Sequence, residues 1–169
     1  MRKAIFLAIA DAMASVINPD LCPDGIPFVD LWNDEVNQLN GGSAFALPAV
    51  FVEFEQIDWR QENNGARRAT AGVRLHVVTR SVPTHGHRDP RMAEALALFD
   101  LLNDINRAMQ ALRGDNFAGF QLTTSATNHA HTELVESVER FAVAVQDVTA
   151  MRRDKRVVGL SAVVSGPRQ

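Results

Sequence analysis

Cysteine, long apolar runs and signal sequences are scarce or missing in this chain. Its single cysteine, Cys22, excludes a disulfide within the chain. The N-terminal apolar stretch, Ala4 to Ala10, ends at Asp11 and is far shorter than the roughly 20 residues of a membrane-spanning helix. No convincing small-residue cleavage site follows it, so we expect a folded helix rather than a signal peptide. These features predict a protein of cytosolic origin with no membrane partner.

The chain also lacks an excess of charge of one sign. Its 17 Lys and Arg residues are balanced by 20 Asp and Glu residues, and the formal net charge is -3 at pH 7. No long polybasic block appears, so the usual footprint of sequence-independent phosphate binding is missing.

Signatures of enzymatic chemistry are missing as well. There is no G-x-S-x-G turn and no helical H-E-x-x-H pair. Gly41-Gly42-Ser43 lacks the lysine and the glycine spacing of a phosphate-binding loop. Cys22 lies in a Pro-rich loop, and a lone thiol without a placed base is usually inert. The sequence therefore predicts no catalytic residue, no metal, no cofactor and no enzymatic activity.

What the chain has in quantity is apolar residues, which make up 46 % of its 169 positions. That is material for one core, and the length is that of one ordinary domain, residues 1–169. Apolar positions three or four apart predict a helix over Arg2 to Ile17, which Asn18-Pro19 ends. The segment near 18–46 contains Pro and Gly and is expected to be a surface arm, or a packed loop with a short strand or helical turn.

Alternating apolar residues then predict a long antiparallel hairpin. Leu47–Trp59 is its first strand, Val73–Val78 returns, and the polar stretch Arg60–Arg68 joins them. Glu53 and Glu55 share one face of the first strand, where paired carboxylates usually serve solubility or an ion-pairing interface.

The clearest predicted element is a second helix. Asp89 is expected to cap it, Pro90 to occupy its first turn and Gly114 to close it, with apolar residues recurring three or four apart between them. Phe99 belongs to that apolar set, so we expect it in the core.

The last third of the chain returns to strands. Phe117–Thr124 predicts one strand, irregular near Gly119, and the next runs near Val138–Val148 with Phe141 in the core. Val157–Val164 is a candidate for a final short strand. This order predicts an α+β fold: an antiparallel sheet of two hairpins with two helices packed on one face.

Two pairs of histidines are the only candidates for metal chemistry. His85 and His87 lie in one loop, and His129 and His131 in another. Alternate histidines can share a metal, which would make the protein a small metal-dependent enzyme. No third ligand lies at a diagnostic spacing, so polar loops that happen to contain histidine are the plainer interpretation. A generic small-molecule binding domain is a third hypothesis, which an apolar pocket would favour.

Five side chains are candidates for contact with a neighbouring subunit or partner: Trp32, Trp59, Arg67, Arg68 and Arg153. Tryptophan is enriched at the energetic centres of interfaces, although both could equally be core edges. The arginines suit docking on an acidic surface, with solvated charge as the plainer interpretation.

Several segments carry a resemblance to a known family. They are V-D-L-W-N (29–33), L-P-A-V-F-V-E-F-E-Q-I-D-W (47–59), V-R-L-H-V-V-T (73–79), L-F-D-L-L-N-D-I-N (98–106) and H-A-H-T-E-L (129–134). Together they resemble a phage or prophage tail-completion protein, and the order of elements is similar to that of the tail terminators of long-tailed phages. The similarity covers most of the chain. The Pro-rich segment 18–28 and the basic turn at 152–156 depart from it.

The resemblance implies a structural virion protein without enzymatic activity. Members of that group form a ring, typically a hexamer, that caps the tail tube and joins it to the neck. The implied partners are other copies of the chain, the tail tube protein and the neck or connector protein, with no sequence-specific contact to nucleic acid although DNA passes through the ring. The implied location is the tail of the virion, assembled in the cytoplasm of the bacterial host. A ring requires a head-to-tail interface that closes by rotation.

Overall fold

The computed structural model describes residues 1–33, 45–128 and 133–151. This part of the chain contains two α-helices, seven strands and one short 3-10 helix. In chain order the elements are α1 (Arg2–Ala14), β1 (Phe28–Leu31), β2 (Ala49–Phe54), β3 (Arg60–Gln61), η2 (Asn63–Gly65), β4 (Arg67–Arg80), α3 (Met92–Ala111), β5 (Arg113–Gly114), β6 (Phe117–Asn128) and β7 (Leu134–Asp147).

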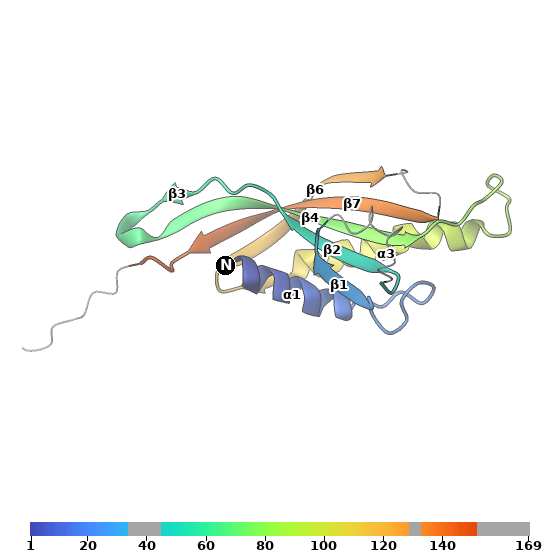
Figure 1. The fold of residues 1–169 in the computed structure, drawn as a ribbon, viewed down its shortest axis with the longest axis horizontal. Helices are drawn as coiled ribbons and strands as arrows, with labels where there is room; N and C mark the ends of the chain where they lie inside the picture. The colour runs from blue at the N-terminus through green and yellow to red at the C-terminus, as the bar shows by residue number, and fades with distance from the viewer. Residues whose placement is uncertain (34–44, 129–132, 152–169) are drawn as a thin grey trace, which may run out of the picture.

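All of these strands belong to one sheet. Its order is β1-β2-β4-β7-β6-β5, and β3 pairs with β4 outside that path. β1 runs parallel to β2, whereas the other described pairs are antiparallel. The longest ladder joins β4 to β7, from Arg67 opposite Asp147 to Arg80 opposite Leu134. The sheet is mixed and curls like half of a barrel (Figure 1).

The predicted α+β fold, an antiparallel sheet of two hairpins with two helices packed on one face, is wrong. The fold is mixed α/β with one larger sheet. β7 pairs with β4 as well as with β6, and this merges the two expected hairpins. β1 has four residues and β3 and β5 have two each, which is too short for an alternating pattern to reveal.

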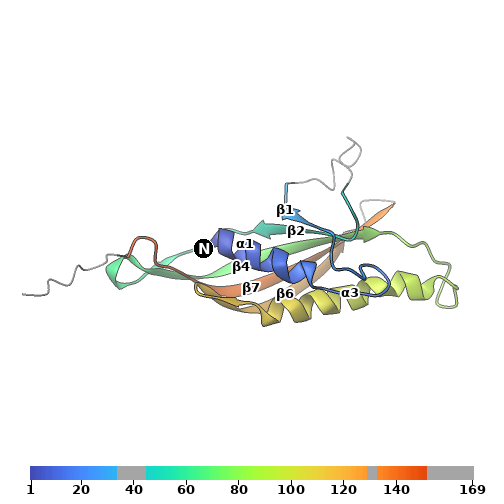
Figure 2. The ribbon, with the colours of Figure 1, turned by 90° about the horizontal axis from the view of Figure 1, so that it is seen from below.

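The main core lies between the helices and the sheet. Both helices contribute positions spaced four apart, which places them on one side of each helix. They meet apolar side chains of β2, β4, β6 and β7 in one cluster, and Figure 2 shows the helices lying along the sheet. The buried helix positions are Ile5, Ile9, Met13, Ala97, Leu101, Ile105 and Met109. Phe141 is fully buried in the same cluster, which confirms its predicted place.

Phe99 corrects a second prediction. We expected this ring in the core, but 57 % of the residue is exposed. It lies two positions before Leu101, which is buried in the core stripe of α3. Two positions correspond to about 200° around a helix, so the Phe99 side chain points away from that stripe.

The ends of several elements differ from the sequence prediction. The second helix begins at Met92, and the Asp89 carboxylate instead accepts the amide of Arg91 at 2.8 Å. The irregularity near Gly119 is confirmed, because this residue has a φ of +73° and the register of β6 shifts beside it. The candidate strand 157–164 lies outside the described residues.

The described part of segment 18–46 is a packed loop followed by β1. Asn18, Cys22 and Ile26 are buried, and the Asn18 side chain accepts amides from the turn that follows it. Residues 34–44 lie outside the described part. No helix among the described residues is long and apolar enough to cross a membrane.

Candidate functional site

One end of the molecule extends as an arm, which we define as residues 60–70. It consists of β3, η2 and the first residues of β4. β2 pairs with β4 only from Val73 onward, so the start of β4 continues beyond β2. In Figure 1 the arm projects past the beginning of α1. Three of the five predicted interface residues, Trp59, Arg67 and Arg68, come together in or beside this arm.

Arg67 fixes the base of the arm. Its guanidinium donates to one carboxylate oxygen of Asp147 at 2.7 and 3.1 Å and stacks 4.6 Å from the centre of the Trp59 ring. The Thr149 hydroxyl and amide also donate to Asp147. These hydrogen bonds, from Thr149 first and then Arg67, hold the pKa of Asp147 far below its ordinary value. Arg67 is therefore committed to a contact within the chain.

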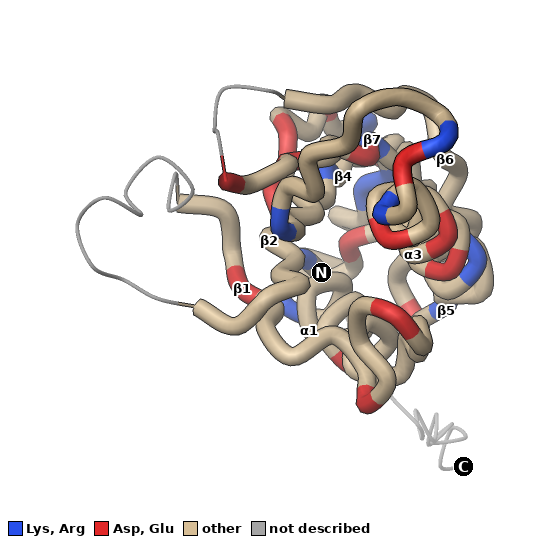
Figure 3. Tube along the Cα trace, turned by 90° about the vertical axis from the view of Figure 1, so that its right-hand side faces the viewer, with Lys and Arg blue, Asp and Glu red and all other residues tan. Residues whose placement is uncertain are grey.

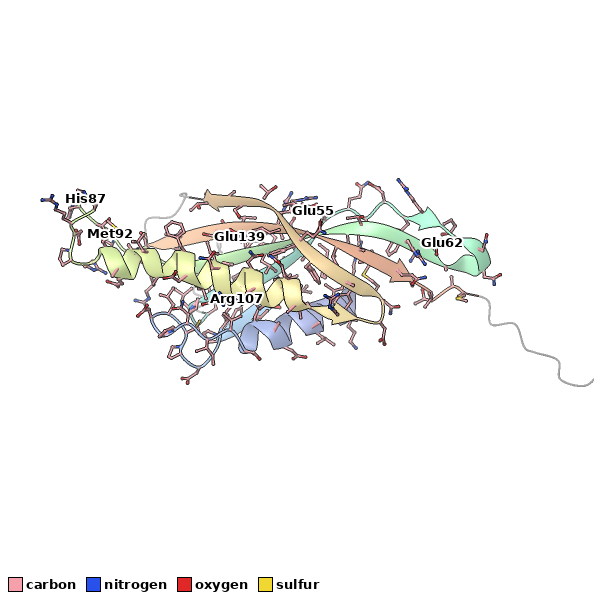
Figure 4. All side chains as sticks on the ribbon, turned by 180° about the vertical axis from the view of Figure 1, so that it is seen from behind. Glu55, Glu62, His87, Met92, Arg107 and Glu139 are labelled. Atoms are coloured by element: carbon pink, nitrogen blue, oxygen red, sulfur yellow. The ribbon has the colours of Figure 1, made fainter. Side chains whose placement is uncertain are left out.

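Arg68 and the tip of the arm are exposed. The Arg68 guanidinium lies 3.0 Å from Glu62, with 64 % and 35 % of the two side chains accessible. An ion pair this exposed contributes about 0–1 kcal/mol, so Arg68 can exchange Glu62 for an acidic group of a partner. Figure 4 shows Glu62 on the arm, well away from the helices.

The turn at the tip of the arm depends on backbone shape. Asn64 has a φ of +60° and Gly65 a φ of +83°, conformations that disfavour most side chains. A Cβ at Gly65 would overlap the backbone carbonyl of Ala150. The segment after β7 therefore packs against this turn, and the described chain ends beside it at Met151.

Trp32 lies elsewhere, on the opposite face of the sheet from the helices. Its ring stacks flat on the His76 imidazole, with centroids 3.8 Å apart and planes 5° from parallel. Its edge meets Phe51 in a small second cluster. The structure thus separates Trp32 from Trp59. Arg153, the remaining predicted interface residue, lies outside the described part of the chain.

His76 is held between two carboxylates beneath the Trp32 ring. Nδ1 lies 2.6 Å from Glu136 and Nε2 lies 3.1 Å from Glu53, and only 8 % of the imidazole is exposed. Carboxylates only accept, so both contacts are hydrogen bonds when the ring carries two protons or one carboxyl carries its own. The Asn128 amide donates to the other oxygen of Glu136 at 2.8 Å.

Glu53 and Glu55 do form ion pairs, but within the chain. Arg74 reaches both carboxylates, at 3.3 and 2.8 Å, and Arg140 binds Glu55 through two nitrogens at 2.7 and 2.9 Å. The hydrogen bonds from Arg140 chiefly lower the pKa of Glu55. Gly72 leaves the room for this pair, because a Cβ there would overlap the Glu55 carboxylate.

A groove of about 320 Å³ with a mixed apolar and polar lining lies between α3 and β6. Phe99 and Leu122 line it and are 57 % and 37 % exposed. At its floor Glu139 accepts the Ser125 hydroxyl, and burial raises the pKa of this carboxyl despite that bond. Figure 4 labels Glu139 on β7, beyond the helix that carries Arg107. The sequence analysis missed this groove because the helical periodicity placed Phe99 in the core, whereas the ring is exposed and lines the groove.

The histidine loops show little in the described residues. His87 is exposed, and the His85 backbone amide donates to Asp89 at 2.8 Å. His129 and His131 lie outside the described part. Within residues 1–33, 45–128 and 133–151, no group of three metal-ligating side chains occurs. The metal hypothesis therefore gains no support from the part of the chain that can be seen.

Charges of both signs alternate over the described surface. Figure 3, seen along the molecule, shows acidic and basic positions interspersed rather than gathered into one area. The functional candidates are accordingly the arm, the Trp32–His76 stack and the groove between α3 and β6. Comparison with known proteins found no match, either to the models of protein families or among curated proteins.

Proposed function

We propose that this chain is the structural subunit of a ring that completes a phage-type tail. The ring would cap the tail tube and join it to the neck, as the resemblance of the sequence to tail terminators implies. The observation that carries the proposal is the arm, residues 60–70, which extends beyond the helix-covered body and presents exposed polar side chains.

The two ends of the molecule differ as a closed ring requires. A head-to-tail interface joins two unlike surfaces, one on each neighbour, and closes when the rotation between neighbours fits. The arm lies at one end of the sheet. The groove between α3 and β6 lies farther along the sheet, beside the middle of α3 from Phe99 to Asn106. An arm at one end and a groove away from it are two unlike surfaces of the kind that such an interface joins.

The polar character of the arm suits contacts that form late in assembly. The Arg68–Glu62 pair near its tip is exposed and weakly held, and charges of this kind favour specificity and encounter over affinity. A subunit of this kind stays apart until a complementary surface is offered. The tip of a finished tail tube would be that surface.

The test is assembly of the full chain with and without tail tubes from the same genome. Mass photometry gives the number of subunits, and negative-stain electron microscopy shows whether rings sit on tube ends. We expect closed rings, alone or at tube ends. A chain that stays monomeric at every concentration and ignores tube ends would refute the proposal.

A matched pair of variants locates the contact. Arg68→Glu reverses a charge on the arm, whereas Asp11→Lys reverses one on the exposed side of α1, outside the residues of the arm and of the groove. We expect the first change to weaken ring formation and the second to leave it intact. Equal effects would remove the arm from the interface.

A further inference from the structure

The outer edge of β6 lacks a partner strand in the described structure. On one side β6 pairs with β7 from Phe117 to Asn128, with two interruptions of the register. On the other side only Phe117 and Ala118 pair with a described strand, the two-residue β5. The stretch from 119 to 127 therefore presents strand edge toward the groove and α3.

This edge carries none of the usual chemical protection. Natural sheets blunt exposed edges with lysine, other charges or proline, since a bare edge pairs readily with another strand. The sequence from 117 to 128 is F-A-G-F-Q-L-T-T-S-A-T-N, which contains no charged residue and no proline. The two register shifts of β6 end by Thr124, and beyond it the pairing with β7 is regular. A regular, uncharged stretch of edge is thus available.

The side chains next to the edge complete a binding surface. Phe99 of α3 and Leu122 of β6 expose apolar surface into the groove, and Leu96, one turn earlier in the helix, is 47 % exposed. Strand addition combines main-chain hydrogen bonds along an edge with pockets for alternate side chains of the added strand. The edge of β6 supplies the first and the groove the second.

We propose that residues 157–164 of a second copy of the chain add to the β6 edge as a strand. This inference rests on the proposed ring, because it names the contact that joins one subunit to the next. The segment is V-V-G-L-S-A-V-V, which is uncharged and rich in β-branched residues, like the edge that would receive it.

Charge and position point to the same occupant. Residues 152–156, R-R-D-K-R, carry four basic residues and one acidic residue. α3, which borders the groove, carries Glu94, Asp100 and Asp104 against Arg107 alone. A basic stretch leading into the groove therefore meets an acidic helix.

The described chain reaches Met151 at the arm end of the molecule, beside the turn at Gly65. The regular part of the β6 edge, residues 124–127, pairs with residues 137–140, away from the arm end of β7. In a head-to-tail ring the arm end of one subunit meets the opposite end of the next. The C-terminal segment of one copy is thereby delivered to the β6 edge of its neighbour.

Cross-linking of mixed chains tests this directly. One full chain carries Ala126→Cys on the β6 edge, and a second chain, distinguishable by mass, carries Ala162→Cys or Ser161→Cys so that either register is sampled. Cys22 is buried, so we expect it to form no cross-link under these conditions. We expect disulfide-linked heterodimers under mild oxidation, at least tenfold above a control in which Gln110→Cys on the exposed side of α3 replaces Ala126→Cys. Heterodimers no more abundant than in the control would overturn the inference, as would cross-links that form only within a chain carrying both cysteines.

A second variant separates this contact from ring formation as such. Ala126→Lys places a charge on the edge at an exposed position, and Gln110→Lys is its matched control. We expect the first to abolish rings with an unchanged circular dichroism spectrum and the second to retain them. Rings that persist in Ala126→Lys would overturn strand addition and leave the proposed function standing. If the mixed chains cross-link but form neither rings nor caps on tail tubes, the strand contact would be supported and the proposed function would be wrong.

Discussion

The contact between His76 and Glu136 allows a quantitative test of the face that lies opposite the helices. The two side chains are 8 % and 5 % exposed, and their atoms lie 2.6 Å apart. A hydrogen bond to a charged group contributes about 1.5–3 kcal/mol when it is buried. Glu136→Gln keeps the shape of the side chain but removes its charge and one acceptor. We therefore expect this substitution to lower the free energy of unfolding by about 2 kcal/mol.

Urea unfolding followed by circular dichroism measures that loss, and thermal unfolding should show a decrease in Tm of about 4–8 °C for a domain of this size. The control is Glu94→Gln. Glu94 forms an ion pair with Arg91 on α3 in which both side chains are about half exposed. The control should change stability by less than about 0.5 kcal/mol.

Trp32 reports on the same site, because its ring stacks on His76. With Trp59→Phe as the background, only Trp32 fluoresces, and its emission should change in Glu136→Gln at neutral pH before any unfolding. If Glu136→Gln and Glu94→Gln unfold at the same urea concentration, and Trp32 emission is unaltered, the carboxylate does not hold the imidazole as described.

Three further predictions follow from the packing. Gly72→Ala should destabilise the chain by no more than about 1 kcal/mol, because its Cβ would overlap the Glu55 carboxylate, which ends a flexible side chain and can move aside; a loss of several kcal/mol in urea unfolding would contradict this. In the same assay Leu101→Ala should lower the free energy of unfolding by about 2–5 kcal/mol and Phe99→Ala by less than about 0.5 kcal/mol. The opposite order would show that Phe99, not Leu101, is the core residue. The pKa of Asp147 is lower in the folded chain than in the unfolded chain, so its stabilising effect is complete above the ordinary carboxyl pKa of 3.8 and is lost as the pH falls toward the folded value. The stability gap between the wild type and Asp147→Asn should therefore be present at pH 6 and shrink below pH 4 in acid titrations, and a gap independent of pH would refute this.

The elements that repeat a period over many residues could be predicted from the sequence. α1 and α3 space their buried residues four apart, and β7 alternates over most of its length, whereas the first four residues of β2 are all buried and β4 alternates only at its start. Their pairing could not be predicted. Nothing local in β7 says that its second neighbour is β4, because that contact joins residues up to 80 positions apart. A two-residue strand such as β5 has no period at all.

The candidate sites divide in the same way. Trp59 ends the first strand of the predicted hairpin, and Arg67 and Arg68 lie in its predicted loop, so their common location follows once the hairpin is recognised. His76 and Glu136 are 60 positions apart and meet only through the β4–β7 ladder. Phe99 shows a different limit. Helical spacing shows that α3 has apolar residues on more than one side. Which of these sides is buried depends on where the sheet lies, and the helix sequence alone does not contain that information.

The distribution of charge across the sheet bears on what covers β6. β7 lies inside the sheet, yet it carries Glu136, Glu139, Arg140 and Asp147, each satisfied by a partner within the chain. β6 lies toward the edge, yet it carries no charge over 12 residues. A sheet that worked alone would gain from the reverse arrangement, because edge charges deter pairing while buried charges cost desolvation. The observed arrangement suits a chain in which β6 gains a second neighbouring strand when copies of the chain associate. The charged strand β7 already has β4 and β6 as neighbours within the chain.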